Sequence, residues 1–191
     1  MGPFEKIKAT LKVSRASCAP YVPSEPEIVR KMLDAAMVGP KDVVYDLGCG
    51  DGRILIMAVK DFGAKKAVGY ELNEDLYKST LGEIEHQKLK NRINLINGDL
   101  FEADISQATV ITLFLTMPGN QRLKPKLAKE ATPGTRIVSY HFMISGWQAS
   151  KTVPLIIEYE GVLWYYSNIY LYIIPNTAVH SSIRDGIYRV S

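Results

Sequence analysis

Apolar residues recur at two spacings that alternate along most of the chain. Helical spacing covers residues 24–36, 54–62, 74–89 and 118–127, and short apolar runs cover residues 43–45, 66–70, 93–96, 109–117 and 135–140. An apolar residue at every third or fourth position predicts a helix, whereas a short continuous run predicts a buried strand. Two more strand-like runs follow at residues 155–164 and 166–174. Strands that alternate with helices, closed by a terminal pair of strands, predict an α/β fold.

The first predicted helix carries its own start and stop signals. Ser24 and Glu27 have the spacing of a capping box, with Pro26 in the first turn, and Gly39-Pro40 ends the apolar pattern. A second cap is expected at Asn73, directly before the helix at residues 74–89.

The first strand ends in an acidic residue, after which glycine occupies every second position. The run reads Asp46-Leu47-Gly48-Cys49-Gly50-Asp51-Gly52-Arg53 and leads directly into a helix. Glycine lets a ligand approach the main chain, and the free N–H groups of a helix start attract electron-rich groups. The dinucleotide fingerprint G-x-G-x-x-G has a third glycine where this chain has Arg53. A carboxylate at Asp46 would repel a pyrophosphate but could hold an ammonium group through water. The loop therefore suits an amino-acid tail better than NAD, and a glycine-rich turn without a ligand is the alternative.

Two further acidic residues follow strands of the predicted sheet. Glu71 comes about 20 residues after the glycine loop, where a carboxylate can accept hydrogen bonds from both hydroxyls of a ribose. Asp99 follows the third strand, where it can accept from the exocyclic amine of adenine, and the neighbouring Phe101 can cover the ring. The alternatives are a surface charge at Glu71 and an ordinary Gly-Asp turn at residues 98–99.

The run YDLGCGDGRI at residues 45–54 resembles motif I of class I S-adenosylmethionine (SAM) methyltransferases, in which this loop holds the methionine part of the cofactor. The resemblance implies a Rossmann-like, seven-stranded, mostly parallel sheet with helices on both faces and a C-terminal antiparallel strand pair. It implies SAM as the cofactor, S-adenosylhomocysteine as the product, and no metal. It assigns cofactor binding to Tyr21, Asp46, Gly48, Gly50, Asp51, Arg53, Glu71, Leu72, Asn73, Gly98, Asp99, Leu100, Phe101 and Phe114.

A wider likeness covers about residues 20–174 and is to archaeal broad-specificity protein-lysine methyltransferases and their mitochondrial relatives. The matching segments are Tyr21–Pro23, Asp46–Arg53, Thr112–Leu115, Leu123–Leu127 and Gly134–Trp147. In that family the first segment folds over the cofactor, which makes Tyr21 the candidate lid residue; a tyrosine packed at a helix entry is the alternative. The family commonly has an Asn soon after the fourth strand, where this chain reads Met117-Pro118. This departure leaves the choice of acceptor open.

Methyl transfer from a sulfonium is an in-line displacement, so catalysis is mainly alignment of the reacting atoms. A lysine acceptor must arrive neutral although its ordinary pKa is about 10.4, and burial among aromatic and apolar groups disfavours its charged form. The resemblance places the acceptor near the end of the fourth strand. The candidate catalytic residues are Tyr21, Phe114, Thr116, Phe142 and Trp147, with Tyr140 as a further wall of the channel. For His141, a stacked ring is preferred to a role in proton transfer.

Composition adds weak constraints. The net charge of +3 permits an acidic partner without demanding nucleic acid, and no apolar run approaches membrane-spanning length. A disulfide between Cys18 and Cys49 is not expected, because Cys49 belongs to the glycine loop. We expect a cytoplasmic monomer that acts on proteins with exposed lysines, with no stable nucleic-acid partner and no membrane insertion. Its predicted parts are a basic arm (residues 1–19), a methyltransferase domain (20–175) and a tail (176–191).

The sequence leaves other acceptors open. The segment after the fourth strand lacks the Asn/Asp-Pro-Pro-aromatic motif of adenine-N6 and glutamine methyltransferases, and it lacks the cysteine used in pyrimidine-C5 methylation. A methyltransferase for a small molecule or RNA on the same scaffold is the alternative function. A third possibility is a module that binds SAM or a partner without catalysis.

Overall fold

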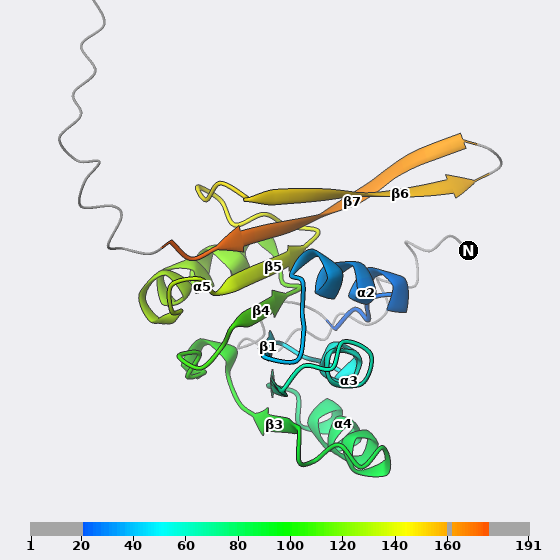
Figure 1. Ribbon diagram of the computed structural model, residues 1–191, viewed down its shortest axis with the longest axis vertical. Coiled ribbons are helices and arrows are strands. Elements are labelled where there is room, and N and C mark those ends of the chain that lie inside the picture. The colour runs from blue at the N-terminus through cyan, green and yellow to red at the C-terminus, as the bar shows by residue number, and fades with distance from the viewer. Residues whose placement is uncertain (1–20, 160–161, 176–191) are drawn as a thin grey trace, which may run out of the picture.

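The computed structural model describes residues 21–159 and 162–175, and within them seven strands form one sheet in the order β3-β2-β1-β4-β5-β7-β6 (Figure 1). Strands β1 to β5 run parallel, while β7 is antiparallel to both β5 and β6. This arrangement confirms the predicted mostly parallel sheet with a C-terminal antiparallel pair. The strands are β1 (Val43–Leu47), β2 (Lys66–Glu71), β3 (Ile93–Asn97), β4 (Val110–Leu113), β5 (Arg136–Tyr140), β6 (Lys151–Tyr159) and β7 (Val162–Ile173).

Helices cover both faces of this sheet, because alternate residues of each buried strand point to opposite sides. In β1, Val44 packs in a cluster with α2 and α3, whereas Tyr45 and Leu47 pack in a second cluster with α5. Figure 1 shows α2, α3 and α4 on one side of the sheet and α5 on the other. The helices are α2 (Pro26–Ala35), α3 (Arg53–Lys60), α4 (Glu74–His86) and α5 (Met117–Glu130), with a short 3-10 helix η1 (Leu100–Glu102).

The two predicted helix caps have different outcomes. The side chain of Asn73 accepts hydrogen bonds from the main-chain N–H groups of Asp75 and Leu76, both at 3.0 Å, so this cap is confirmed. The capping box at Ser24 was wrong, because α2 begins at Pro26 with Glu25 as an N-cap that makes no side-chain bond. Ser24 is buried, and its carbonyl oxygen accepts instead from the guanidinium of Arg53.

The fourth strand is shorter than the apolar run at residues 109–117 predicted. β4 ends at Leu113, and Met117 already belongs to α5. The side chain of Thr116 caps this helix by accepting from the N–H of Gly119 at 3.1 Å. Apolar character continues past the strand because Leu115 is a buried core residue outside the sheet.

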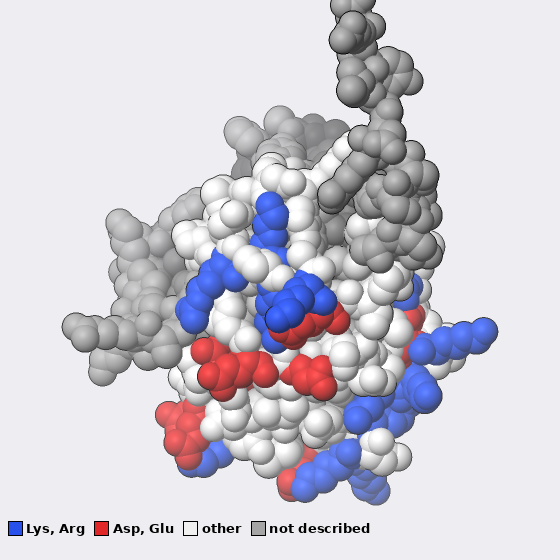
Figure 2. All heavy atoms as spheres, turned by 90° about the vertical axis from the view of Figure 1, so that its left-hand side faces the viewer, with Lys and Arg blue, Asp and Glu red and all other residues white. Residues whose placement is uncertain are grey.

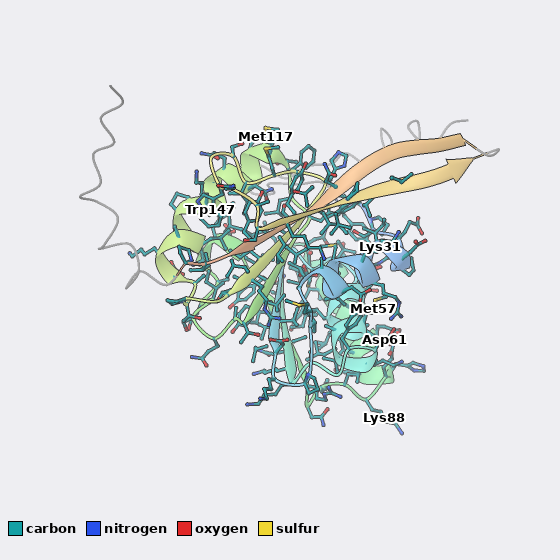
Figure 3. All side chains as sticks on the ribbon, turned by 45° about the horizontal axis from the view of Figure 1, so that its top comes forward. Lys31, Met57, Asp61, Lys88, Met117 and Trp147 are labelled. Atoms are coloured by element: carbon teal, nitrogen blue, oxygen red, sulfur yellow. The ribbon has the colours of Figure 1, made fainter. Side chains whose placement is uncertain are left out.

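The break between the last two strands was also predicted at the wrong place. β6 ends at Tyr159 and β7 begins at Val162, so residues 160–161, which lie outside the described part of the chain, connect them. The polar pair Ser167 and Asn168 lies within β7, where Ser167 is buried against His141. β5 pairs only with the Ile169–Ile173 part of β7. Beyond it the β6–β7 hairpin projects past α2 (Figures 1 and 3). The predicted arm at residues 1–19 and tail at 176–191 lie outside the described residues.

Candidate functional site

The glycine loop connects the end of β1 to α3 and bends sharply. Gly48, Gly50 and Gly52 all have φ in the left-handed region, at +94°, +55° and +74°, a conformation that glycine adopts without steric cost. The N–H groups of Gly48 and Cys49 both donate to the carbonyl oxygen of Tyr70, at 2.9 and 3.0 Å. The loop is therefore fastened to the end of β2, beside Glu71.

Glu71 lies directly against this loop. One carboxylate oxygen accepts from the N–H of Gly50 at 2.8 Å, and the other accepts from the N–H of Asn73 at 2.8 Å. On the opposite side, the buried hydroxyl of Thr80 in α4 donates to the carbonyl oxygen of Gly50 at 2.8 Å. The structure thus brings together the loop and the acidic residue that the sequence placed about 20 positions apart.

Asp46 is a buried carboxylate at the end of β1. Its side chain accepts from the hydroxyl of Thr112 in β4 at 2.8 Å and is only 3% exposed. Burial raises the pKa of Asp46 to about 7, with a smaller contribution from the nearby carboxylates of Glu71 and Asp51, and against the hydrogen bond from Thr112. Such a carboxylate can be stabilised in its charged form by a cation bound at the loop.

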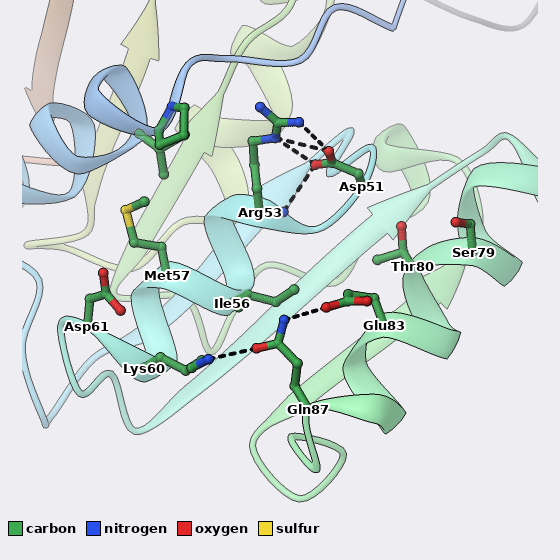
Figure 4. Close-up of a pocket in the computed structure, with 12 residues that line it drawn as sticks. Asp51, Arg53, Ile56, Met57, Lys60, Asp61, Ser79, Thr80, Glu83 and Gln87 are labelled. Carbon is green, nitrogen blue, oxygen red and sulfur yellow. Dashed lines mark hydrogen bonds and ion pairs between the residues drawn. The ribbon is translucent and has the colours of Figure 1, made fainter.

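Asp51 and Arg53 hold the segment Tyr21–Ser24 across the glycine loop. The Tyr21 hydroxyl donates to Asp51 at 3.1 Å, and Arg53 Nε donates to both carboxylate oxygens of Asp51, at 2.9 and 3.0 Å. Another bond joins the Arg53 guanidinium to the carbonyl oxygen of Ser24, and Figure 4 shows the Arg53–Asp51 pair at the start of α3. Burial opposes ionisation of Asp51, but the bonds from Arg53 outweigh it, so the pKa of Asp51 is lowered. We call residues 21–24 the strap.

The ring of Tyr21 packs directly on Gly50. A methyl group placed on Gly50 would lie 2.7 Å from Cε2 of this ring. This position of the ring fits the predicted lid. The hydrogen bonds to Tyr21 and Ser24 show that the polar atoms of Asp51 and Arg53 face the strap.

The pocket in Figure 4 lies beside the start of α3 and is lined by residues of α2, α3 and α4. Its polar side chains bind one another, since Lys60 donates to Gln87 at 2.9 Å and Gln87 donates to Glu83 at 2.5 Å. The Lys60–Gln87 contact joins α3 to the end of α4, and we assign the pocket no ligand.

Residues predicted to hold adenine lie where β2 and β3 end. Asp99 caps η1 by accepting from the N–H of Phe101 at 2.9 Å, and the N–H of Gly98 donates to the carbonyl oxygen of Glu71 at 3.1 Å. Leu72 is 40% exposed, whereas Leu100 is buried near Gly48. Glu71, Gly98 and Asp99 therefore meet at one edge of the sheet.

The ring of Phe101 has a neighbour that the sequence did not indicate. The guanidinium carbon of Arg122 in α5 lies 3.7 Å from the ring centroid, a cation–π contact. Any contact of this ring with adenine, which stays a prediction, would have to use surface that Arg122 does not cover.

An aromatic row follows the ends of β4 and β5. Phe114, which follows β4, is 4.5 Å from Tyr140, and the row continues through His141 to Phe142, with centroid separations of 6.0 and 4.5 Å. Trp147 lies apart from this row, since its ring packs edge-on against Tyr172 at 5.9 Å. The structure thus brings Phe114 and Phe142 into one row, whereas the ring contact of Trp147 is with β7.

Four hydrogen-bonding residues of this edge were missed by the sequence analysis: Thr80, Thr112, Asn120 and Ser139. Each is buried and binds a group on another element. Thr112 and Ser139 left a signal, as polar residues within otherwise apolar stretches of β4 and β5. Among the described residues, no three His, Cys, Asp or Glu side chains are grouped to hold a metal ion. Nor does any helix in that part of the chain have the length and hydropathy needed to cross a membrane.

Comparison with known proteins gives consistent matches. The family model of the ANTKMT methyltransferase domain matches residues 46–151. A protein-lysine N-methyltransferase of Saccharolobus islandicus is 50% identical over 136 residues, which cover 71% of this chain and 84% of that protein. An adenine nucleotide translocase lysine N-methyltransferase of Mus musculus is 30% identical over 165 residues, with 85% of this chain and 66% of that protein covered.

A solved structure matches over most of the fold. It is an RNA methyltransferase from Salinibacter ruber in complex with S-adenosyl-L-homocysteine, 38% identical, with a TM-score of 0.72 over 88% of this chain and 100% of that chain. The bound product is the demethylated form of SAM, the cofactor that the glycine loop predicts. The chain therefore belongs to the ANTKMT methyltransferase domain family and is a SAM-dependent methyltransferase.

Proposed function

We propose that this chain transfers methyl groups from SAM to lysine side chains of other proteins. The observation that carries the proposal is the 50% identity to the Saccharolobus islandicus protein-lysine N-methyltransferase, because the match extends over 84% of that protein. The Mus musculus relative is also named for a lysine acceptor. Two relatives from distant organisms thus share one acceptor group.

The residues of the glycine loop fit the proposed cofactor. SAM carries a sulfonium and an ammonium group, and the carboxylates of Asp46, Asp51 and Glu71 gather around the loop. The Tyr21 ring occupies the space beside Gly50, where a side chain would displace it. In the proposed assignment Asp46 and the glycine loop hold the methionine end, and Glu71 with Asp99 holds the adenosine end. When bound, the cofactor supplies an activated methyl group.

The aromatic row supports a lysine acceptor. A lysine that lies against the accessible parts of Phe114 and Phe142 would lose water from its ammonium group, which favours the neutral amine needed for attack. The proposed catalytic contribution of these rings is alignment and exclusion of water. Thr116 caps α5 beside them and fixes the direction of the helix.

The test is methylation of proteins with labelled SAM. The purified enzyme is incubated with nuclease-treated protein extract or with RNA from the same cells, and products are identified by mass spectrometry. We expect label on lysine side chains of proteins in the first reaction. RNA is the second candidate because the Salinibacter ruber structure is named an RNA methyltransferase. Label on RNA or metabolites, with none on protein, would refute the proposal.

The charges on one face are compatible with a protein acceptor. On the face in Figure 2, Lys and Arg side chains lie next to Asp and Glu side chains near the centre. We further propose a monomer that acts in the cytoplasm, without a stable nucleic-acid partner, and a methyltransferase domain bounded by residues 20 and 175.

The contacts of Arg53 with the strap lead to a prediction for the affinity of SAM. Arg53→Met removes the bonds to Asp51 and Ser24 that hold the strap against the loop. We expect SAM to bind about tenfold more weakly, equivalent to roughly 1.4 kcal/mol. Calorimetric titration measures this constant. Lys60→Met is the matched control, because Lys60 is on the same helix but binds Gln87 instead of the strap. Equal affinities of the two variants would contradict the role of the strap.

A further inference from the structure

Two side chains of α5 hold the loop that follows β5. Asn120 and Lys124 are one helical turn apart and so lie on the same side of α5. Asn120 Nδ2 donates to the carbonyl oxygen of Phe142 at 3.0 Å, and Lys124 Nζ donates to that of Ser145 at 2.7 Å. We call residues 141–147 the acceptor loop, because it carries Phe142 of the aromatic row. The helix that begins after β4 therefore determines where this loop lies.

The other side of the acceptor loop is held by the sheet. The N–H of Ile144 donates to the hydroxyl of Tyr172 in β7 at 2.9 Å, and Ile144 itself is fully buried. His141 has a left-handed φ of +70° and a ring nitrogen 2.7 Å from the hydroxyl of Ser167. The loop backbone is thus fixed from both sides, while the side chain of Met143 remains 46% exposed.

Asn120 is the unusual member of this network. Its Nδ2 group also donates to Ser139 Oγ at 3.1 Å, and Ser139 in turn donates to the Phe142 carbonyl at 2.6 Å. Both amide hydrogens are therefore used, which sets the orientation of the amide. Oδ1 then points into the protein and is the buried side-chain polar atom without a hydrogen-bond partner in the described part of the chain.

An unpaired buried acceptor of this kind opposes folding. An apolar side chain of similar size would avoid the desolvation penalty, and the Phe142 carbonyl would still be paired with Ser139. Stability therefore does not account for an amide at this position. What the amide adds is a second, directional bond to the carbonyl oxygen of Phe142.

We propose that Asn120 is a positioning residue for methyl transfer, which acts by fixing Phe142 and the acceptor loop against the start of α5. The proposal rests on the proposed lysine acceptor. Asn120 sets the place of the aromatic wall, which determines alignment of the incoming amine. It does not touch the glycine loop or Glu71, so cofactor binding does not depend on it.

The test compares Asn120→Leu with the control Lys126→Met. Leucine has a similar volume and removes the bond to Phe142, whose carbonyl stays paired with Ser139, so the variant is expected to keep or raise the melting temperature. Lys126 is on the same helix but pairs with Glu130 at 2.6 Å instead of the loop. For Asn120→Leu we expect a kcat at least tenfold lower on a lysine-bearing protein that the wild type methylates, with S-adenosylhomocysteine affinity within twofold of wild type. Lys126→Met should keep the wild-type kcat and the wild-type affinity for S-adenosylhomocysteine.

Two outcomes would overturn the proposal. One is a kcat of Asn120→Leu close to that of Lys126→Met, and the other is a loss of product affinity equal to the loss of kcat. If Asn120→Leu does not fold, kcat and product affinity are measured for Lys124→Met, which removes the bond to Ser145. The same two outcomes would then overturn the proposal.

A readout without an acceptor separates this proposal from the proposed function. Trp147 ends the acceptor loop, and Trp164 is the other tryptophan of the chain. In a Trp164→Phe background, Asn120→Leu should make Trp147 fluorescence more accessible to acrylamide than Lys126→Met does. If the wild type methylates no lysine but this difference is seen, the proposed acceptor is wrong and the positioning contact holds. Equal quenching in both variants overturns the positioning contact.

Discussion

Asp46→Asn is expected to raise the melting temperature of the free protein while it largely abolishes SAM binding. The carboxylate is buried with a pKa of about 7, and its hydrogen bond from Thr112 needs only an acceptor oxygen, which asparagine retains. In the unfolded chain this group has an ordinary pKa near 3.8. Between these values the folded protein binds a proton that the unfolded chain has released. The free energy of unfolding of the wild type therefore falls as pH rises through this window.

The expected gain in the free energy of unfolding of Asp46→Asn follows from the difference between the folded and unfolded pKa values of Asp46. Each pKa unit corresponds to about 1.36 kcal/mol, so Asn should add roughly 2–4 kcal/mol above pH 8 and nothing near pH 4. Thermal unfolding followed at several pH values measures the gain. The control is Asp34→Asn, an exposed carboxylate on α2, which should leave the melting temperature within about 1 °C. A gain that is the same at pH 4 and pH 8 would contradict the assignment to Asp46.

The affinity for SAM should change with pH in the direction opposite to that of the stability. A cationic ligand at the loop favours the ionised carboxylate, so SAM affinity of the wild type is expected to increase as pH rises through about 7. Asp46→Asn should bind at least a hundredfold more weakly, roughly 2.7 kcal/mol, and without this pH dependence. Calorimetric titration at pH 6 and pH 8 tests both statements. A variant affinity within threefold of the wild type would show that Asp46 does not contact the cofactor's cationic groups through charge.

Gly50→Ala is expected to give the second large effect. Gly50 has a φ of +55°, and a methyl group there would lie 2.7 and 3.0 Å from Cε2 and Cδ2 of Tyr21. The new methyl group strains the backbone by about 1 kcal/mol and displaces the Tyr21 ring. We expect a lower melting temperature and at least tenfold weaker SAM binding.

The matched control for this variant is Gly82→Ala. Gly82 lies in α4, and no atom is within 4 Å of an added methyl group. Alanine there should stabilise the helix by roughly 0.5–1 kcal/mol without changing SAM affinity. Thermal unfolding and calorimetric titration of both variants give the comparison. If Gly50→Ala behaved like Gly82→Ala, the close approach of Tyr21 to the loop would have no functional importance.

The sequence by itself determined the order of elements and predicted the residues of the cofactor half of the site. Periodic apolar positions indicate helices and buried strands, because these periods are properties of consecutive residues. The glycine loop, Glu71 and Asp99 could be assigned because parallel strands bring their carboxyl ends to one edge. Once strands β1, β2 and β3 are recognised, the convergence of these residues follows.

Only the tertiary structure decided which polar groups meet across that edge. Thr112 bonds to Asp46, and Asn120 bonds to Phe142, through pairs that are far apart in sequence and carry no periodic pattern. The early end of β4 and the position of the last hairpin depend in the same way on packing against other elements. Local patterns report which face of an element is apolar. The partner of a single buried hydroxyl or amide is set by the folded chain, since that group must find a hydrogen bond wherever packing places it.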